Sequence, residues 1–242
     1  MYLRGLLALI VSAAASAANA QTLTLHFQDR PPYSTIVTGG AAAGLVAAPA
    51  ERAVRAAGIP FVWALTPSQR QLALIQQGNG LDCGIGWFRS AERAALGKFS
   101  APLYRDEPFA ALGRPGVLAG PSLRATEILS AASAGLLLKE GYSYGAYLDG
   151  LIAAARPAPV RTHADPLQML RMVAAGRADW MIATPEEAAA LLAALGPEAA
   201  DVKLLRMADV PPGQTRHLYC NRAVPDDWLQ RIDRALGAAA GR

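Results

Sequence analysis

The chain has 242 residues, of which 52% are hydrophobic and 17% are charged, and this globular composition excludes an intrinsically disordered chain. The formal net charge is +4, but the arginines are dispersed and form no basic block with interleaved aromatic residues. Nucleic acid is therefore not an expected partner.

The first twenty residues predict a secretory signal peptide. They contain one positive charge at Arg4, an apolar stretch from Leu6 and an Ala-x-Ala cleavage signal at residues 18–20. A polar sequence follows, so a membrane anchor is not expected. No cysteine lies at the cleavage point to carry a lipid. We expect an exported protein of a bacterial periplasm that is not a lipoprotein.

The following residues predict alternating strands and helices. A strand at 22–27, a helix at about 44–57 and a strand at 61–65 have lengths and connections that suit parallel β-α-β crossovers. In residues 66–87, Thr66 is the predicted N-cap of a helix that opens with a proline. A glycine stop and an apolar strand after Asp82 follow.

A second segment, residues 165–184, repeats this helix–glycine–aspartate–strand unit. Asp165 is its predicted N-cap, and a strand follows Asp179. Strands at 135–138 and 160–163 flank a helix after Ser143, and Thr184 opens a further helix with a capping box. The pattern predicts an α/β protein of two lobes, each with a small, mostly parallel sheet.

Two segments are expected to connect the lobes and form a hinge. Residues 99–116 predict an extended connection, and residues 215–222 predict a returning strand before a final helix at 226–236. If that helix packs on the first lobe, the chain crosses between the lobes twice. The expected organisation is a signal peptide at 1–20, the first lobe at 21–110 and 216–242, and the second lobe at 111–215.

Residues 141–145, GYSYG, match the G-x-S-x-G pattern of a hydrolase nucleophile elbow. The same strand–turn–helix context describes an anion cradle, in which backbone N–H groups and a hydroxyl hold a carboxylate or phosphate. A serine hydrolase using Ser143 would also need an acid and a histidine. Asp179 or Asp209 with His217 would supply them in the required order.

A set of short motifs, taken in order, resembles the bacterial extracellular solute-binding proteins of family 3. The motifs are PPY at 31–33, Gly78-x-x-x-Asp82, Ser90-x-x-Arg93 with the following Phe99-Ser100-x-Pro102-x-Tyr104, Gly141-Tyr142-Ser143, and Gly176-Arg177-x-Asp179. The resemblance covers about residues 22–239. It implies the type II periplasmic binding fold, in which two hinged lobes close on a small solute, and an ABC-type permease as partner.

The resemblance also implies a binding site. Arg93 corresponds to the arginine that binds the solute's carboxylate, and its planar fork matches carboxylate geometry. Ser143, next to Tyr142, corresponds to the hydroxyl that holds the same group. Weaker candidates are aromatic residues for the wall of the cleft and charged residues near it. The aromatic candidates are Tyr33, Trp87 and Phe88, and the charged ones are Arg70 and Arg89. For the pair Asp29 and Arg30 the alternatives are that they reach the cleft, that they pair with each other, or that they face water.

One position departs from the family pattern. Amino-acid binders of the family place an acid, which pairs with the ligand's α-amino group, where this sequence has Thr184. Either Glu186 or Glu187 substitutes, or the ligand is not an ordinary α-amino acid. Both glutamates also suit the first turn of a helix, where they favour the helix dipole and complete a capping box.

The fold also bears on the two cysteines, Cys83 and Cys220. The resemblance places their strands side by side, and an oxidising compartment makes them candidates for a disulfide; the alternative is two separately buried thiols.

We expect a monomeric periplasmic receptor that captures a small organic anion or amino-acid-like solute and delivers it to a membrane permease. No catalytic residue, cofactor or metal is expected. The alternatives are an enzyme on the same fold, such as a periplasmic dehydratase, the Ser143 hydrolase, and a sensory input protein that signals to a membrane receptor.

Overall fold

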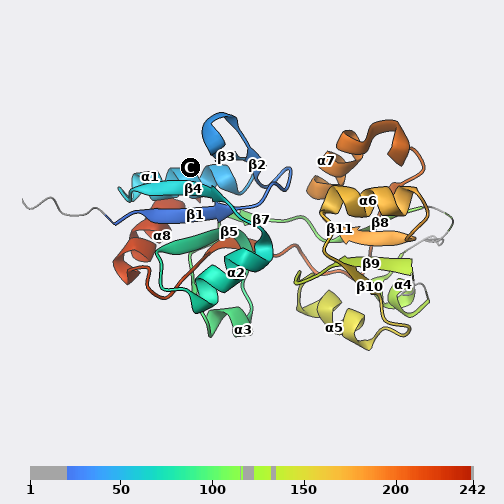
Figure 1. The fold of residues 1–242 in the computed structure, drawn as a ribbon. Helices are drawn as coiled ribbons and strands as arrows, with labels where there is room; N and C mark the ends of the chain where they lie inside the picture. Colours follow the sequence, from blue (N-terminus) through green and yellow to red (C-terminus); the bar gives the residue numbers. More distant parts are fainter. Residues whose placement is uncertain (1–20, 115, 117–122, 132–134, 241–242) are drawn as a thin grey trace, which may run out of the picture.

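The computed structural model describes residues 21–114, 116, 123–131 and 135–240. The expected signal peptide lies outside these residues. Two α/β lobes lie side by side and are connected by two extended segments (Figure 1). None of the helices in the described part of the chain has the length and apolar character that crossing a membrane requires.

The first lobe is built on a mixed sheet with the strand order β4-β1-β5-β13-β6. Its strands are β1 (Leu23–Phe27), β4 (Phe61–Leu65), β5 (Asp82–Phe88), β6 (Lys98–Phe99), β7 (Tyr104–Arg105) and β13 (Thr215–Cys220). β1 runs parallel to both β4 and β5, whereas β13 is antiparallel to β5, β6 and β7. The returning strand β13 therefore completes the first lobe.

The helices of the first lobe are α1 (Ala47–Ala56), α2 (Ser68–Gln77), α3 (Ala91–Ala94) and α8 (Asp226–Ala240). A small hairpin, β2 (Thr35–Ile36) and β3 (Ala42–Ala43), precedes α1. Apolar side chains of α1 and α8, such as Val54 and Ile232, share one core with Leu23 and Leu25 of β1. The C-terminal helix thus packs on the lobe in which the chain begins (Figure 1).

The second lobe has the strand order β10-β9-β11-β8-β12. Its strands are β8 (Ala110–Gly113), β9 (Leu136–Lys139), β10 (Val160–Thr162), β11 (Trp180–Ala183) and β12 (Lys203–Arg206). Strands β10, β9 and β11 are parallel to one another. β8 pairs antiparallel with β11, and β12 pairs antiparallel with β8 at the edge of the sheet. The α-helices of the lobe, among the described residues, are α4 (Ala125–Ala131), α5 (Ala146–Ala154), α6 (Pro166–Ala174) and α7 (Pro185–Leu195).

Side-chain caps are found at the starts of three helices, and one predicted cap is absent. The side chains of Ser90, Asp165 and Thr184 accept hydrogen bonds from backbone N–H groups at the starts of α3, α6 and α7. The prediction for Thr66 is wrong, because α2 begins at Ser68 and the Thr66 hydroxyl bonds instead to the ring of His26, at 2.9 Å.

The lobes are connected by residues 106–109 and 207–214. Residues 99–116 are not one extended connection, because they contribute β7 to the first sheet and β8 to the second. β8 begins at Ala110 and β13 at Thr215, each one residue before the expected lobe boundary. The two connections also contact each other, since the Asp106 N–H donates to the Gln214 carbonyl at 3.0 Å.

The two cysteines lie opposite each other on neighbouring strands. Cys83 of β5 pairs in register with Cys220 of β13, and their sulfurs form a disulfide. Both residues are fully buried in the core of the first lobe. The bond therefore links the end of the chain to the sheet that its beginning forms.

Candidate ligand-binding site

A cavity of about 50 Å³ lies between the two lobes. On the first lobe it is lined by residues that follow β1, by the end of β5 and by side chains from α2, α3 and β13. On the second lobe it is lined by the turn before α5. The lining residues are Gln28, Arg30, Gln71, Ile85, Gly86, Trp87, Phe88, Arg93 and Arg216, opposite Gly141, Tyr142 and Ser143.

Arg93 reaches this cavity from α3. Ser90 caps the short helix, with its hydroxyl 3.2 Å from the Arg93 N–H. The guanidinium carbon lies 4.8 Å from the ring centre of Trp87, and Nη1 donates to the Phe88 carbonyl at 3.0 Å. Burial lowers the pKa of Arg93, and the nearby Tyr219, Glu92 and Asp149 offset this only in part. No carboxylate of the described residues forms an ion pair with Arg93. A partly desolvated guanidinium of this kind is suited to an incoming anion.

The turn at Ser143 already binds a carboxylate, which belongs to Asp149 of α5. The Ser143 hydroxyl donates to Asp149 Oδ2 at 2.5 Å, and the Tyr144 N–H donates to Oδ1 at 2.8 Å. The Gly145 N–H donates to Ser143 Oγ at 3.2 Å. Two donors of the turn thus converge on one carboxylate, which is that of Asp149.

The structure does not assemble the triad that the hydrolase interpretation requires. His217 lies in β13 of the first lobe, where its ring nitrogens contact the Ser100 carbonyl and the Thr215 hydroxyl. Asp209 binds the start of α4, and Asp179 pairs with Arg114. Ser143 donates to a carboxylate, and no histidine contacts it in the described part of the chain. A serine in this setting is not an activated nucleophile.

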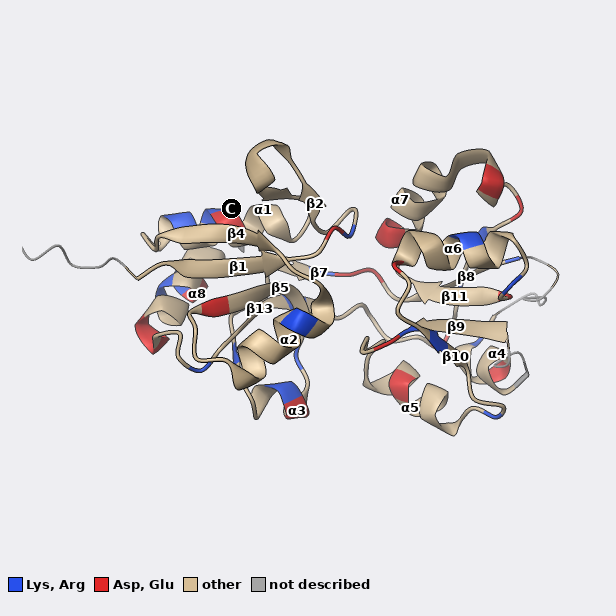
Figure 2. Cartoon of the chain, in the orientation of Figure 1, with Lys and Arg blue, Asp and Glu red and all other residues tan. Residues whose placement is uncertain are grey.

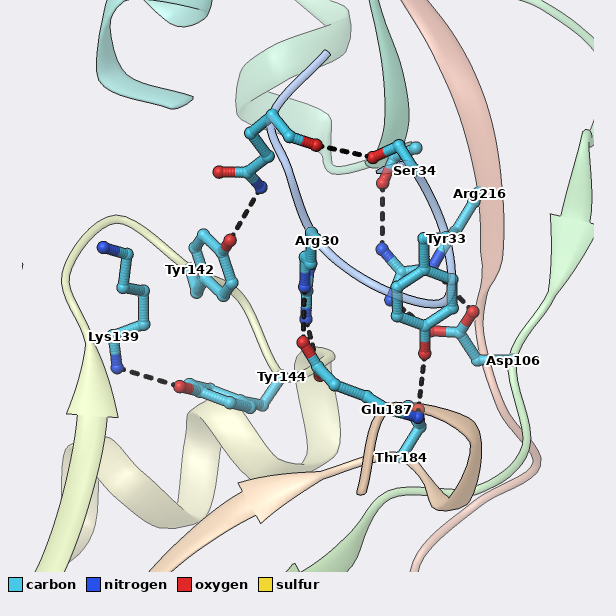
Figure 3. A network of polar contacts seen from close by, with 12 residues as sticks. Arg30, Tyr33, Ser34, Asp106, Lys139, Tyr142, Tyr144, Thr184, Glu187 and Arg216 are labelled. Atoms are coloured by element: carbon cyan, nitrogen blue, oxygen red, sulfur yellow. Dashed lines mark hydrogen bonds and ion pairs between the residues drawn. The ribbon is translucent and has the colours of Figure 1, made fainter. Parts of the chain in front are cut away.

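Arg30 extends from the first lobe to Glu187 at the start of α7 (Figure 3). Its Nε and Nη2 donate to Glu187 Oε1 and Oε2 at 2.6 and 2.8 Å. The guanidinium carbon also lies 4.7 Å from the ring centre of Tyr142 and 5.3 Å from that of Tyr33. Burial lowers the pKa of Arg30, but Glu187 and the two tyrosines outweigh this and raise it above its usual value.

The hinge and the cleft meet at Arg216. This side chain, which is 3% exposed, makes two hydrogen bonds of 2.6 Å to the buried carboxylate of Asp106 in the first connection. Its guanidinium carbon lies 3.8 Å from the ring centre of Tyr33. The Tyr33 hydroxyl in turn contacts the Thr184 hydroxyl of the second lobe (Figure 3). Burial raises the pKa of Tyr33, so this hydroxyl stays protonated as a hydrogen-bonding group.

The sequence-based candidates are placed in three groups. The first group lines the cavity and consists of Arg93, Arg30, Ser143, Tyr142, Trp87 and Phe88. Tyr33 and Thr184 are buried beside it and contact each other.

The third group lies outside the cavity. Arg89 is exposed and lines a larger neighbouring cavity of about 610 Å³, which Ser143 and Asp149 also border, and Arg70 is exposed on α2. Glu186 accepts hydrogen bonds from the Tyr104 hydroxyl and the Glu107 N–H, both at 2.8 Å, and so binds the hinge. In Figure 2 the acidic start of α7 faces the first lobe.

Three cavity residues with polar side chains were not identified from the sequence. Gln28 donates to the Tyr142 hydroxyl at 2.7 Å, and Gln71 accepts from the Trp87 ring N–H at 3.0 Å. Arg216 is the third. All three lie at or near strand ends of the first lobe. Ligands usually bind at the edge where the carboxyl ends of parallel strands lie, so position at that edge was the signal in the sequence that could have identified them.

No family model matches the sequence, and no curated protein matches it significantly. Solved structures do match. An ancestral arginine-binding protein bound to arginine is similar over 91% of this chain and 92% of its own, with a TM-score of 0.72 and 15% identity. The substrate binding protein of an amino acid ABC transporter matches over 91% and 93%, with a TM-score of 0.68 and 17% identity.

The chain has the type II periplasmic binding protein fold. At identities this low the similarity establishes the fold, with its two mixed sheets and its double connection. The same fold matches a histidine kinase sensor domain with similarity to periplasmic binding proteins, over 91% of this chain and 90% of that one, with a TM-score of 0.73 and 19% identity. Proteins with this fold thus include both transporter components and a sensor domain.

Proposed function

We propose that this protein is a periplasmic receptor that captures a small carboxylate-bearing solute between its lobes. The observation that carries the proposal is Arg93, a guanidinium of the cleft that forms no ion pair with a carboxylate of the described residues. It lines the same cavity as the Ser143 turn of the opposite lobe. One carboxylate bound to both would connect the lobes through charge-assisted hydrogen bonds.

Capture requires the lobes to separate and close. A cavity of about 50 Å³ holds only a few water molecules, so a solute enters when the lobes are apart. The incoming carboxylate competes with Asp149 for the Ser143 hydroxyl and the Tyr144 N–H, and it brings Arg93 a partner. The solute shifts the population toward a closed form because it binds that form more tightly.

The proposed partner is a membrane permease that receives the solute. The match to a substrate binding protein of an ABC transporter supports this role, and the match to a sensor domain supports the sensory alternative. An enzyme is the weaker alternative, because none of the residues that line the cavity is an aspartate, glutamate or histidine able to act as a general acid or base. Uptake of the labelled solute in cells with and without the protein separates transport from sensing.

The test is a thermal-shift screen of residues 21–242 against amino acids, dicarboxylates, polyamines and other small organic anions. A solute at 100 times its dissociation constant stabilises a protein by about 2.7 kcal/mol. We expect a carboxylate to raise the melting temperature, and Arg93→Ala to abolish the shift. Arg70→Ala is the matched control, because Arg70 is an exposed arginine of the same lobe. A shift that survives Arg93→Ala would overturn the proposed site.

A further inference from the structure

The contacts of Arg30 make up a complete cation site. Its guanidinium makes two parallel hydrogen bonds to the carboxylate of Glu187 and lies near the ring faces of Tyr142 and Tyr33. The Glu187 side chain is 4% exposed and the Arg30 side chain 14%. A buried carboxylate flanked by aromatic faces is the environment in which proteins bind a guanidinium or ammonium ligand.

This cation site adjoins the cavity that Arg93 reaches. Arg30 and Tyr142 line the cavity together with Arg93, so a solute bound to Arg93 would occupy a cavity that Arg30 also borders. The cation site therefore lies where a second charged group of the solute would bind. In this protein its occupant is one of the chain's own side chains.

The other carboxylates near the cleft are also bound. Asp106 holds Arg216, and Glu186 accepts hydrogen bonds from the hinge. Asp149, with which the solute's carboxylate competes for the Ser143 turn, does not line the cavity. The residues that line the cavity include three arginines and no carboxylate. A solute with an ammonium or guanidinium group would have to leave that group without a charged partner, at a large desolvation cost.

We propose that Arg30 is a built-in occupant of the cation site formed by Glu187, Tyr33 and Tyr142, and that it restricts the cleft to anionic solutes without a cationic group, such as simple mono- and dicarboxylates. The inference rests on the proposed function for the carboxylate at Arg93. It assigns the class of solute and makes Arg30 the residue that determines it.

The first experiment uses the unaltered protein. Titration calorimetry compares succinate and other dicarboxylates with arginine, lysine and methylguanidinium, all at matched ionic strength. We expect at least one carboxylate to bind, and the three cationic probes to bind at least tenfold more weakly or not at all. Binding of arginine, lysine or methylguanidinium as tightly as the best carboxylate would overturn the inference, whatever the variants do.

The second experiment removes the occupant. Arg30→Ala exposes the Glu187 carboxylate and the tyrosine faces, so methylguanidinium should bind at least tenfold more tightly than to the unaltered protein. Arg30→Ala combined with Glu187→Gln should lose this gain. Arg55→Ala is the matched control, because Arg55 also pairs with a glutamate, Glu51, but on the exposed surface of α1.

The outcomes separate this inference from the proposed function. A folded Arg30→Ala protein that does not gain methylguanidinium binding, or a gain that persists with Glu187→Gln, would overturn the cation site. If no carboxylate binds the unaltered protein but Arg30→Ala gains methylguanidinium, the cation site stands and the proposed carboxylate site fails. If Arg30→Ala does not fold, the probes on the unaltered protein decide.

Discussion

Arg216 contacts both the first connection between the lobes and the cleft, so a movement of that connection would shift a residue of the cleft. It binds Asp106 of the first connection, lies over the ring of Tyr33 and lines the cavity. Burial raises the pKa of Asp106 in spite of the neighbouring Arg216, so the pair is not a large net source of stability. Its importance is that neither charge can be left buried alone.

Replacing Asp106 should therefore be costly. Asp106→Ala leaves Arg216 buried without its carboxylate, and we expect a loss of about 3–5 kcal/mol in the free energy of unfolding, measured by urea denaturation. Glu107→Ala is the control, because Glu107 is exposed and its pair with Arg206 should contribute less than about 1 kcal/mol. Equal losses in the two variants would contradict this prediction.

Asp209 should give the stability of the second lobe a dependence on acid pH. Burial raises the pKa of its carboxyl group, but hydrogen bonds from the Ala125 and Thr126 N–H groups and from the Tyr147 hydroxyl outweigh this and lower the pKa to about 2. A lowered pKa stabilises the folded state above about pH 4, and the stabilisation is lost as the pH falls through about 2.

The expected contribution is about 2 kcal/mol at pH 6. Asp209→Asn should lower the melting temperature at pH 6 and leave it little changed near pH 2, as followed by circular dichroism across that range. The exposed Asp201, changed to Asn, should leave the profile unaltered. A constant difference between Asp209→Asn and the unaltered protein at every pH would show that the carboxylate charge is not the cause.

At the scale of elements, the cap of α6 is the clearest case of local sequence determining a helix start. Asp165 accepts from the Gln168 N–H at 2.8 Å, and Pro166 follows it at the first helical position. Loss of such a cap costs about 1 kcal/mol. We expect Asp165→Ala to lower the free energy of unfolding by that amount in urea, and the exposed Gln168→Ala to change it by less than about 0.5 kcal/mol.

Elements with strong local signals were predictable. The expected strand at 61–65 coincides with β4, and the caps Asp165 and Thr184 begin the helices they were expected to begin. β12 was missed, because Lys203–Arg206 has apolar residues only at its two central positions and is placed by pairing with β8 at the sheet edge.

The candidate site was predictable only in part. Arg93 and Ser143 stand in recognisable motifs, and both reach the cavity. Arg30 and Glu187 are 157 residues apart, and their pairing depends on how the lobes face each other, which no local pattern encodes. For Glu187 the capping role was expected, but its carboxylate reaches Arg30 of the other lobe.

At the scale of the whole molecule, the second lobe is an insertion within the first. The chain leaves the first sheet after β7 and returns to it at β13. The Cys83–Cys220 disulfide connects β5, which precedes the second lobe, to β13, which follows it. A bond between residues 137 positions apart restricts the unfolded chain strongly. It holds the returning strand and α8 in the first lobe.

The double variant Cys83→Ala with Cys220→Ala should therefore be less stable by about 2–5 kcal/mol in urea. Binding at the proposed Arg93 site should change little once the protein is folded, because both cysteines are buried in the core of the first lobe and neither lines the cavity. Unchanged stability in the variant, or two free thiols in periplasm-purified protein under denaturing conditions, would contradict a structural role for the bond.

The same disulfide makes most of the chain a covalent ring. The ring includes both lobe connections and every residue of the second lobe, and only the residues before Cys83 and after Cys220 are linear tails. A single backbone cut anywhere in the second lobe leaves one connected molecule, which separates into two fragments only after reduction. Where proteases are present, a nicked chain can therefore keep its two halves together.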